Sequence, residues 1–249
     1  MPRIDFRTPR IFVDAPLAAG RRLALGRGAV NHLVNVLRCR TGDPVLLFNG
    51  RDGEWHAALA RTGRDWIAAI GERARAQPAP ADLHLLFAPL KHARLDYLVQ
   101  KAVEMGVSRI VPVITRHTQV ARVNLARMRA NVIEAAQQCG VLALPEVADP
   151  IDLPRAIAGQ DRLLIFCDEE AAVADPIAVL RAAPRNLPPA LLIGPEGGFA
   201  AEERAMLLRH PHVLRIALGP RILRADTAAV AALALVQAVL GDWRGEAAQ

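Results

Sequence analysis

Short apolar runs alternate with segments of helical period through the last two thirds of the chain, and this alternation constrains the fold most. The runs are bounded by turn residues and are too short for buried helices, so each predicts a strand. The predicted strands are Leu83–Phe87, Ile110–Ile114, Arg162–Phe166, Ala190–Ile193 and Val213–Ile216, and the predicted helices are Leu95–Met105, Leu125–Cys139, Ile177–Ala183, Glu202–Leu208 and Thr227–Leu240. Strands in alternation with helices predict an α/β fold, a parallel sheet covered by helices on both faces.

The first third of the chain has a different pattern. Strands are predicted at Pro44–Phe48, Glu54–Arg61 and Trp66–Ile70, with one helix at Ala29–Leu37, and Asn49–Gly53 is a hairpin signal between the first two strands. A stretch rich in proline and alanine separates this region from the next, as a linker does. We therefore expect three parts: a small β-barrel domain of residues 1–76, a linker of residues 77–82 and an α/β domain of residues 83–249.

The charge is divided unevenly between these domains. Residues 1–76 contain 13 arginines and 7 acidic residues, a net charge of +6, whereas residues 77–249 contain 18 basic and 18 acidic residues. A basic small domain joined to a neutral larger one suggests an anionic partner such as nucleic acid for the first. An arginine-rich, well-solvated surface would give the same composition.

Several classes of protein are disfavoured by composition. Three cysteines lie far apart without a CxxC pair, which argues against a disulfide framework or a zinc cluster and for a reducing compartment. The pair His210 and His212 lacks further ligands, so no metal site is predicted. The first ten residues are polar and basic, unlike a signal peptide, and the longest apolar run, Ala228–Val236, is too short to cross a bilayer. A cytoplasmic protein is expected.

Two predicted strand ends carry unusual residues, and ligands bind at such ends of parallel sheets. Gly194–Phe199 contains three glycines, which permit positive φ and a close approach of backbone to a ligand. Leu218–Thr227 leads into the last helix, with Arg224 just before it and Asp226 or Thr227 as candidate caps. A tight turn and simple helix capping would explain the same residues. Neither segment has the pattern of a P-loop or a dinucleotide fingerprint.

These two segments together resemble the cofactor-binding loops of the SPOUT methyltransferases, and most closely the bacterial family that methylates N3 of a uridine in 16S ribosomal RNA. The similarity continues over nearly the whole chain, in order. It includes Lys91, Arg94, Gln100–Val107, Ile110–Pro112, Glu134–Gly140 and Leu144–Val147 in the larger domain. In the smaller domain, Arg10–Phe12, Asn31–Arg38, Gly42–Asp43 and Leu47–Gly50 resemble the family's PUA-like RNA-binding domain.

The chain departs from the family pattern at three places. Arg224–Thr227 reads Arg-Ala-Asp-Thr where the family usually has Arg-Thr-Glu-Thr, so the carboxylate is kept but shortened. Val141 follows Gly140 where the family usually has an arginine. Thr115–His117 stands where Glu-Arg-Ser or Glu-Arg-Cys is common.

The resemblance implies S-adenosylmethionine as cofactor, a deep trefoil knot near the C-terminus and a homodimer whose active site is completed across the interface. The apolar helix Thr227–Leu240 suits such an interface, although an ordinary core helix would look the same. The residues that we expect to bind the cofactor are Cys167, Gly194, Pro195, Glu196, Gly197, Gly198, Leu218, Gly219, Ile222, Leu223 and Arg224.

The chemistry of the implied reaction suggests two catalytic residues. Methyl transfer to N3 requires removal of its proton or stabilisation of negative charge on the flanking carbonyl oxygens. Asp226 is the first candidate for the base, and Arg224 for holding the pyrimidine or its charge. Glu196 is a second carboxylate candidate, for which a role in stabilising the turn is the alternative.

Phosphate contacts are expected from arginines of the smaller domain, namely Arg10, Arg21, Arg22, Arg27, Arg38 and Arg40. Three hypotheses stay open at this stage. The first is the methyltransferase, acting on 16S ribosomal RNA or the assembled small subunit; the second is an RNA-binding protein of the same fold without catalysis. The third is a nucleotide- or phosphate-binding enzyme that uses Gly194–Gly198 as an anion cradle.

Overall fold

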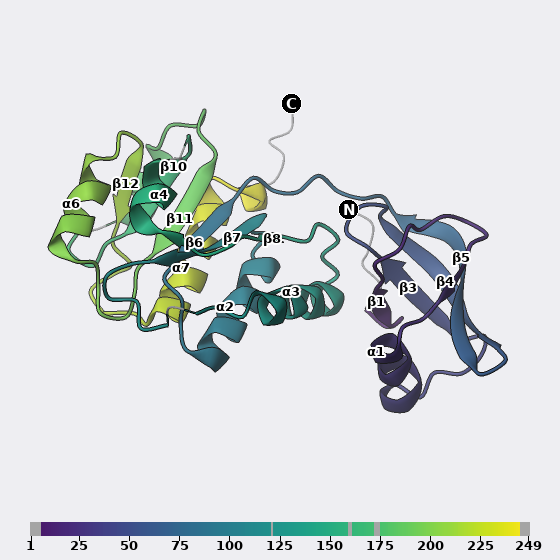
Figure 1. Cartoon of the computed structure of the whole chain (residues 1–249). Coiled ribbons are helices and arrows are strands. Elements are labelled where there is room, and N and C mark those ends of the chain that lie inside the picture. The colour runs from purple at the N-terminus through teal and green to yellow at the C-terminus, as the bar shows by residue number, and fades with distance from the viewer. Residues whose placement is uncertain (1–5, 121, 159–160, 172–174, 245–249) are drawn as a thin grey trace, which may run out of the picture. The chain divides into compact units, whose positions relative to one another are not determined.

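The computed structural model describes residues 6–120, 122–158, 161–171 and 175–244 (Figure 1). The chain divides into two compact units. The N-terminal unit comprises Met1–Ala79 together with Ile133–Leu144, and the α/β unit comprises Pro80–Val132 together with Pro145–Gln249. Each unit has a hydrophobic core of its own.

The N-terminal unit is built on a five-stranded mixed sheet in the order β1-β3-β4-β5-β2. Its strands are β1 (Arg10–Phe12), β2 (Arg22–Ala24), β3 (Pro44–Phe48), β4 (Glu54–Thr62) and β5 (Asp65–Arg75). Only β1 and β3 pair in parallel; the other pairs are antiparallel. A short helix, α1 (Arg27–Val30), continues as a π-helical turn over Asn31–Val36, and Leu33 inserts from it into the core.

The segment Ile133–Leu144 joins this unit through polar contacts to β1 and β5. The Gln137 side-chain oxygen accepts from the Phe12 amide at 2.8 Å. The Arg75 guanidinium donates to the Gly140 carbonyl at 3.0 Å. The sequence pattern placed this segment in the α/β domain, because a continuous helical period carries no sign of a side chain that bonds to another sheet.

The α/β unit contains a parallel sheet in the order β12-β10-β11-β6-β7-β8, and β9 also pairs with β7. The strands are β6 (His84–Phe87), β7 (Arg109–Ile114), β8 (Glu146–Val147), β9 (Ile151–Asp152), β10 (Leu163–Cys167), β11 (Pro189–Ile193) and β12 (Val213–Ile216). The helices are α2 (His92–Glu104), α3 (Leu125–Cys139), α4 (Leu153–Ala158), α5 (Pro176–Arg181), α6 (Ala201–Arg209) and α7 (Ala225–Val239), followed by a short 3₁₀ turn at Asp242–Arg244. The second half of α3, from Ile133, belongs to the N-terminal unit. The central strands are buried on both faces, as a covered parallel sheet requires.

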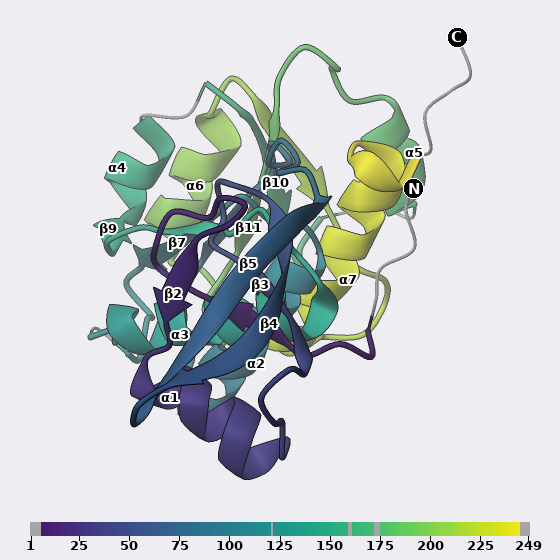
Figure 2. The same cartoon turned by 90° about the vertical axis from the view of Figure 1, so that its right-hand side faces the viewer.

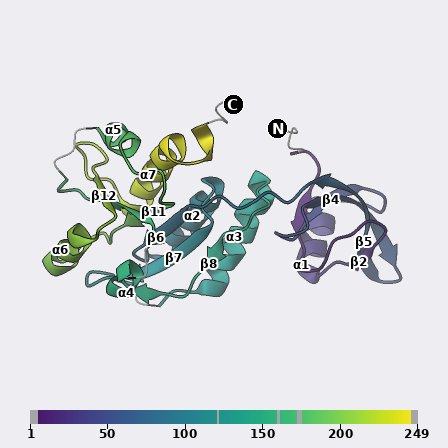
Figure 3. The ribbon, with the colours of Figure 1, turned by 90° about the horizontal axis from the view of Figure 1, so that it is seen from above.

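Helices cover both faces of this sheet. Helix α7 packs against α2, α5 and β11, while α4 packs against α6. Figure 2 and Figure 3 show α5 and α7 on one face and α4 and α6 on the other. Six residues of α7 are buried within this single chain, so the helix is a core element of its own unit.

The predicted α/β class is confirmed, and so is a small β domain ahead of it. The five strands predicted for the larger domain are all present, and so are its five helices, with ends shifted by up to three residues. Strand β8 lies within Leu144–Val147, where the family resemblance implied a strand. Helix α4 and the two-residue strand β9 were not predicted, and β9 is too short to show a period. The trefoil knot stays a prediction. Within the described ranges, no helix is long and apolar enough to cross a membrane.

Candidate functional site

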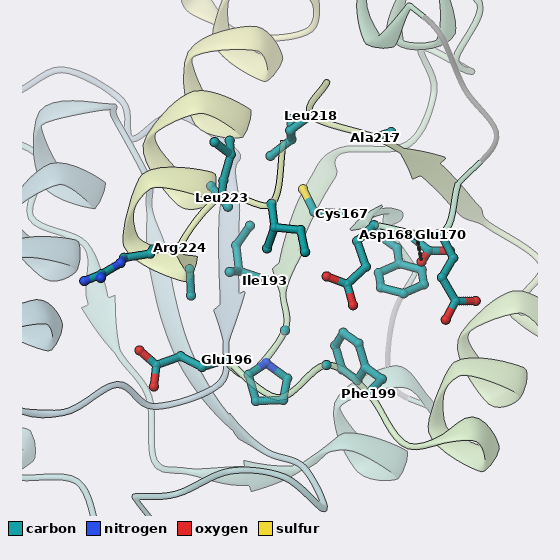
Figure 4. Close-up of a pocket in the computed structure, with 18 of the residues that line it drawn as sticks. Cys167, Asp168, Glu170, Ile193, Glu196, Phe199, Ala217, Leu218, Leu223 and Arg224 are labelled. Atoms are coloured by element: carbon teal, nitrogen blue, oxygen red, sulfur yellow. Dashed lines mark hydrogen bonds between the residues drawn. The ribbon is translucent and has the colours of Figure 1, made fainter. Parts of the chain in front are cut away.

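A cavity of about 660 Å³ opens at the carboxyl ends of three neighbouring strands, β10, β11 and β12 (Figure 4). These strands run parallel, so the loops that follow them meet at one edge of the sheet. The loops are Cys167–Glu170, Gly194–Phe199 and Ala217–Arg224, and the start of α7 adds Ala225 and Ala228. This is the edge at which parallel sheets bind ligands.

The glycine-rich loop after β11 is held by tight local packing. Gly198 has φ of +68°, and its amide donates to the Pro195 carbonyl at 3.0 Å. A side chain at Gly194 would lie 2.5 Å from the Phe199 ring, so only glycine fits there. Phe199 in turn meets Phe166 edge to face at 5.3 Å between ring centroids. The loop therefore presents backbone on one side and an aromatic wall on the other.

The loop after β12 ends at the N-terminus of α7. Arg224 is the N-cap residue and its side chain is exposed, whereas Asp226 is the second residue of the helix. Neither Asp226 nor Thr227 is therefore the cap that the sequence suggested. An aspartate in the first turn is favourable near the positive end of the helix dipole. Arg224 lines the cavity, and Asp226 lies next to it without being among the lining residues.

A buried carboxylate anchors the other end of the cavity. Asp168 has 3% of its side chain exposed and pairs with Arg204 at 3.0 Å and with Arg215 at 2.8 Å. Burial alone would raise the pKa of Asp168, but hydrogen bonds from Arg204, the Glu170 amide and Arg215 together hold it below its ordinary value. Arg204 belongs to α6, Arg215 to β12 and Glu170 to the loop after β10, so the ionised carboxylate ties these three segments together beside the cavity.

A second ion pair lies at the side of the cavity opposite Asp168. Arg94 of α2 donates to the carboxylate of Glu196, and both side chains are about one third exposed. Figure 4 shows the side chains of Glu196 and Arg224 leaving the cavity on the same side, away from Asp168 and Glu170. Between the two ends, burial raises the pKa of the Cys167 thiol to about 12, so this cysteine is an uncharged part of the wall.

The structure brings the predicted cofactor residues together. All eleven, from Cys167 through the two C-terminal loops to Arg224, line this one cavity. Sequence reasoning missed Arg94, Phe166 and Arg204 as lining residues. Arg94 comes from α2, which ends well before β10 begins in the chain, and no spacing in the sequence could have revealed its place here.

The six arginines that the sequence predicted to contact RNA differ in how exposed they are. Arg21, Arg22, Arg27, Arg38 and Arg40 are exposed, and no ion pair to any of them is found among the described residues. Arg38 also adopts φ of +61°, an uncommon conformation for a residue with a side chain. Arg10 differs, because its side chain is buried and its guanidinium donates to Glu54. We therefore leave Arg10 out of the proposed RNA surface.

The cavity suits an adenosyl cofactor. Its volume lies within the range of about 300–1,000 Å³ that is typical of small-molecule sites. Phe166, Phe199 and Ile193 offer apolar surface to a flat purine. Glu169 supplies an exposed carboxylate, the kind of group that accepts from ribose hydroxyls or pairs with a cationic ligand. No cluster of metal-binding side chains occurs in the part of the chain that the structure describes.

Comparison with known proteins gives the class of this chain. A family model described as an RNA methyltransferase domain matches residues 77–237, and one described as an RNA methyltransferase PUA domain matches residues 25–67. Fold, cavity and family models together define an RNA methyltransferase with an N-terminal PUA domain. These findings support an enzyme, and they do not support the alternative of an RNA-binding protein without catalysis.

Individual relatives make the assignment narrower. Ribosomal RNA small subunit methyltransferase E of Rickettsia conorii is 30% identical over 230 residues, covering 92% of this chain and 94% of that protein. A solved methyltransferase of Legionella pneumophila, with SAM bound, has a TM-score of 0.81 and 31% identity over 95% of this chain and 99% of its own. The solved ribosomal RNA small subunit methyltransferase E of Neisseria gonorrhoeae, bound to S-adenosyl methionine, has a TM-score of 0.81 and 29% identity over 95% of this chain and 100% of its own. The chain belongs to the ribosomal RNA small subunit methyltransferase E family.

Proposed function

We propose that this chain transfers a methyl group from S-adenosylmethionine to N3 of a uridine in 16S ribosomal RNA. The observation that carries the proposal is the cavity itself: all eleven predicted cofactor residues line it, and Arg224 stands at its mouth. Related proteins of Legionella pneumophila and Neisseria gonorrhoeae bind this cofactor in the same fold. When bound, the cofactor supplies an electrophilic methyl group on a sulfonium, so neither a metal nor a covalent enzyme intermediate is required.

The protein's own task is to place the uridine and to manage the proton on N3. As the N3–H bond breaks, negative charge spreads onto the two flanking carbonyl oxygens. Arg224 is exposed at the start of α7, where its guanidinium can donate to one of these oxygens and stabilise that charge. Holding the ring in line with the methyl group converts the transfer into an effectively unimolecular step.

Asp226 is the base that we propose for the N3 proton. It follows Arg224 by two residues and lies in the first turn of α7. It does not line the cofactor cavity, and a base has to face the uridine rather than the cofactor. Glu196, the second carboxylate, is already engaged by Arg94, which favours a positioning role for it.

The remaining parts of the proposal concern the whole molecule. We place RNA binding mainly in residues 1–76, through Arg21, Arg22, Arg27, Arg38 and Arg40, and catalysis in residues 83–249. The substrate is 16S RNA, free or in the assembled small subunit, and the active form is a cytoplasmic homodimer that needs no metal. The supporting observations are the exposed arginines and the family to which the chain belongs.

The test uses ribosomal RNA from a strain that lacks the gene, treated with the purified protein and labelled S-adenosylmethionine. We expect incorporation into small-subunit RNA and 3-methyluridine by mass spectrometry.

Arg224→Ala should lower kcat by about 100- to 1,000-fold, as loss of one donor to developing negative charge does. Asp226→Asn should also lower kcat while cofactor binding is retained. Full activity of either variant would remove that residue from the mechanism, and no incorporation by the wild type would refute the proposed function.

A further inference from the structure

The α/β unit carries a strongly basic segment, although residues 77–249 are neutral as a whole. Between Glu104 and Glu134 the chain has five arginines and no acidic residue. The arginines are Arg109, Arg116, Arg122, Arg127 and Arg129. Three of them pair with acidic residues from elsewhere in the unit: Arg109 with Glu146, Arg116 with Glu202 and Arg127 with Asp96. For Arg122 and Arg129 no ion-pair partner is found among the described residues, so these two carry the unbalanced positive charge of the segment.

The first loop of this segment is fixed against the cavity. His117 donates from Nδ1 to the Gly198 carbonyl at 3.0 Å. The Arg116 amide donates to the Glu203 carboxylate at 2.8 Å, and the other oxygen of that carboxylate accepts from the Ala200 amide at 3.0 Å. The loop after β7 is therefore held on the loop after β11, which forms the wall of the cavity.

A shallow groove lies where these two loops meet the start of α2. Lys91, His117, Gln119 and Val120 line one part of it, together with Pro89 and Leu90. The rest is formed by Pro195 and Glu196, which also line the cofactor cavity. The groove therefore begins where the cavity ends, on the side of Arg94 and Glu196.

The charges around this groove favour an anion. Lys91 is exposed and has no ion-pair partner among the residues that the structure describes. Glu196 is the one carboxylate among the described residues that line the groove, and Arg94 neutralises it. Because a carbonyl oxygen only accepts, Nδ1 of His117 donates to Gly198, and Nε2 is the ring atom left to hydrogen-bond a ribose 2′-OH, which can both donate and accept.

We propose that this groove binds the RNA backbone beside the target nucleotide, with Lys91 on a phosphate and with His117 and Gln119 on the adjoining sugar or base. This inference rests on the proposed function and adds a second RNA contact, in the unit that carries the cofactor cavity. A base that enters the cavity mouth must leave its neighbours outside, and the groove lies directly beside that mouth. Arg122 and Arg129, further along the same segment, are also exposed.

The decisive variant is Lys91→Met. Lys91 caps α2 through its backbone alone, with no side-chain capping bond, so the substitution leaves the helix start intact. We expect the KM for small-subunit ribosomal RNA to rise about tenfold, as loss of one charged contact does, with kcat and cofactor affinity within about twofold of wild type. The slope of log K against log salt should fall by about 0.7 to 1, the value for one phosphate. Lys91→Arg should restore both.

A matched control removes the same charge elsewhere in the unit. Arg209→Ala, at the C-terminal end of α6, deletes an exposed cation for which no ion-pair partner is found among the described residues. It should leave the KM for RNA and the salt slope unchanged. An equal effect in both variants would show that net charge matters and the groove does not, and a wild-type KM and slope in Lys91→Met would overturn the proposal outright.

The same measurements separate this inference from the proposed function. If wild-type protein binds the RNA but incorporates no label, the methyl transfer is refuted while the groove is still tested by binding alone. If wild-type protein methylates the RNA and Lys91→Met does so with the same KM, only the groove is refuted. Gln119→Ala, which removes an uncharged contact, should raise the KM by about threefold or less.

Discussion

Two arginine–glutamate clusters, one in each unit, use the same chemistry in opposite surroundings. In the N-terminal unit, Glu54 is bound by Arg10 and by Arg75, at 2.7 Å from the latter, and 3% of the Glu54 side chain is exposed. In the α/β unit, Arg94 is the one ion-pair partner of Glu196 among the residues that the structure describes, and 36% of the Glu196 side chain is exposed. The first cluster is closed to solvent and the second is open at the rim of a cavity.

The difference shows how burial decides what an ion pair does. Both oxygens of Glu54 are occupied, and Arg75 reaches on to the Gly140 carbonyl, so the cluster joins β1, β4, β5 and the end of α3. Water competes for Glu196, so its pair with Arg94 contributes little stability and can exchange partners when a charged substrate arrives. The closed cluster maintains the fold, and the open one is available for binding.

The largest effect is expected from breaking the closed cluster. Glu54→Ala should lower the free energy of unfolding by about 3–5 kcal/mol, because it leaves the guanidinium of Arg10 buried without its carboxylate. Urea unfolding of the full chain, followed by a probe in the N-terminal unit, measures this change. Cofactor binding by the α/β unit should persist in the variant under conditions where the chain stays folded.

The matched control is the exposed pair Asp14–Arg51, which lies in the same unit at 3.6 Å with 84% and 55% of the two side chains exposed. Asp14→Ala should change the free energy of unfolding by less than about 1 kcal/mol. A loss in Glu54→Ala no greater than in this control would mean that the closed cluster is structurally unimportant.

Acidification should lower the free energy of unfolding through two buried carboxylates, Glu54 and Asp168. The loss per pH unit should be smaller than the loss caused by Glu54→Ala. Burial by itself would raise the pKa of Glu54, but hydrogen bonds from Arg75 and Arg10 hold it below the ordinary value of 4.5. The pKa of Asp168 is likewise below 3.8. Because the folded state holds these protons less tightly than the unfolded chain, the stabilisation is complete above the ordinary pKa and is lost as pH falls through the folded one.

The measurement is the free energy of unfolding between pH 6 and pH 3, at a constant salt concentration. Each of the two carboxylates should contribute a slope of at most about 1.4 kcal/mol per pH unit, confined to the acid end of this range. Glu54→Gln should remove the contribution of one group, so its profile should be flatter than that of wild type. Identical profiles would show that Glu54 does not carry the acid sensitivity.

The contrast between the clusters also marks the limit of prediction from sequence. Strand and helix alternation was sufficient for the α/β class, because hydrophobic period is a local property of the chain. The two glycine-containing loops were also predictable, since parallel strands bring their carboxyl ends to one edge. In addition, all eleven predicted cofactor residues line one cavity.

What the sequence could not show were contacts between distant segments. Arg10 looked like a surface cation in a basic domain, and only its pairing with Glu54, 44 residues away, makes it a buried one. Arg94 meets Glu196 across 102 residues of chain. The predicted start of α7, Thr227, is two residues later than the observed start, Ala225. Asp and Thr are better N-caps by propensity than Arg224, the residue that occupies the N-cap position.

The smallest expected change tests the open pair. Glu196→Gln should alter the free energy of unfolding by less than about 1 kcal/mol, because a partly exposed ion pair is screened by water. It should also free Arg94 and remove negative charge from the rim, so RNA should bind more tightly, by no more than about fivefold. Fluorescence anisotropy with small-subunit ribosomal RNA measures the second effect, and Arg94→Ala should shift it in the opposite direction. If Glu196→Gln instead destabilised the chain as much as Glu54→Ala, the rim pair would be a structural element of the α/β unit, and exposure would not distinguish the two clusters.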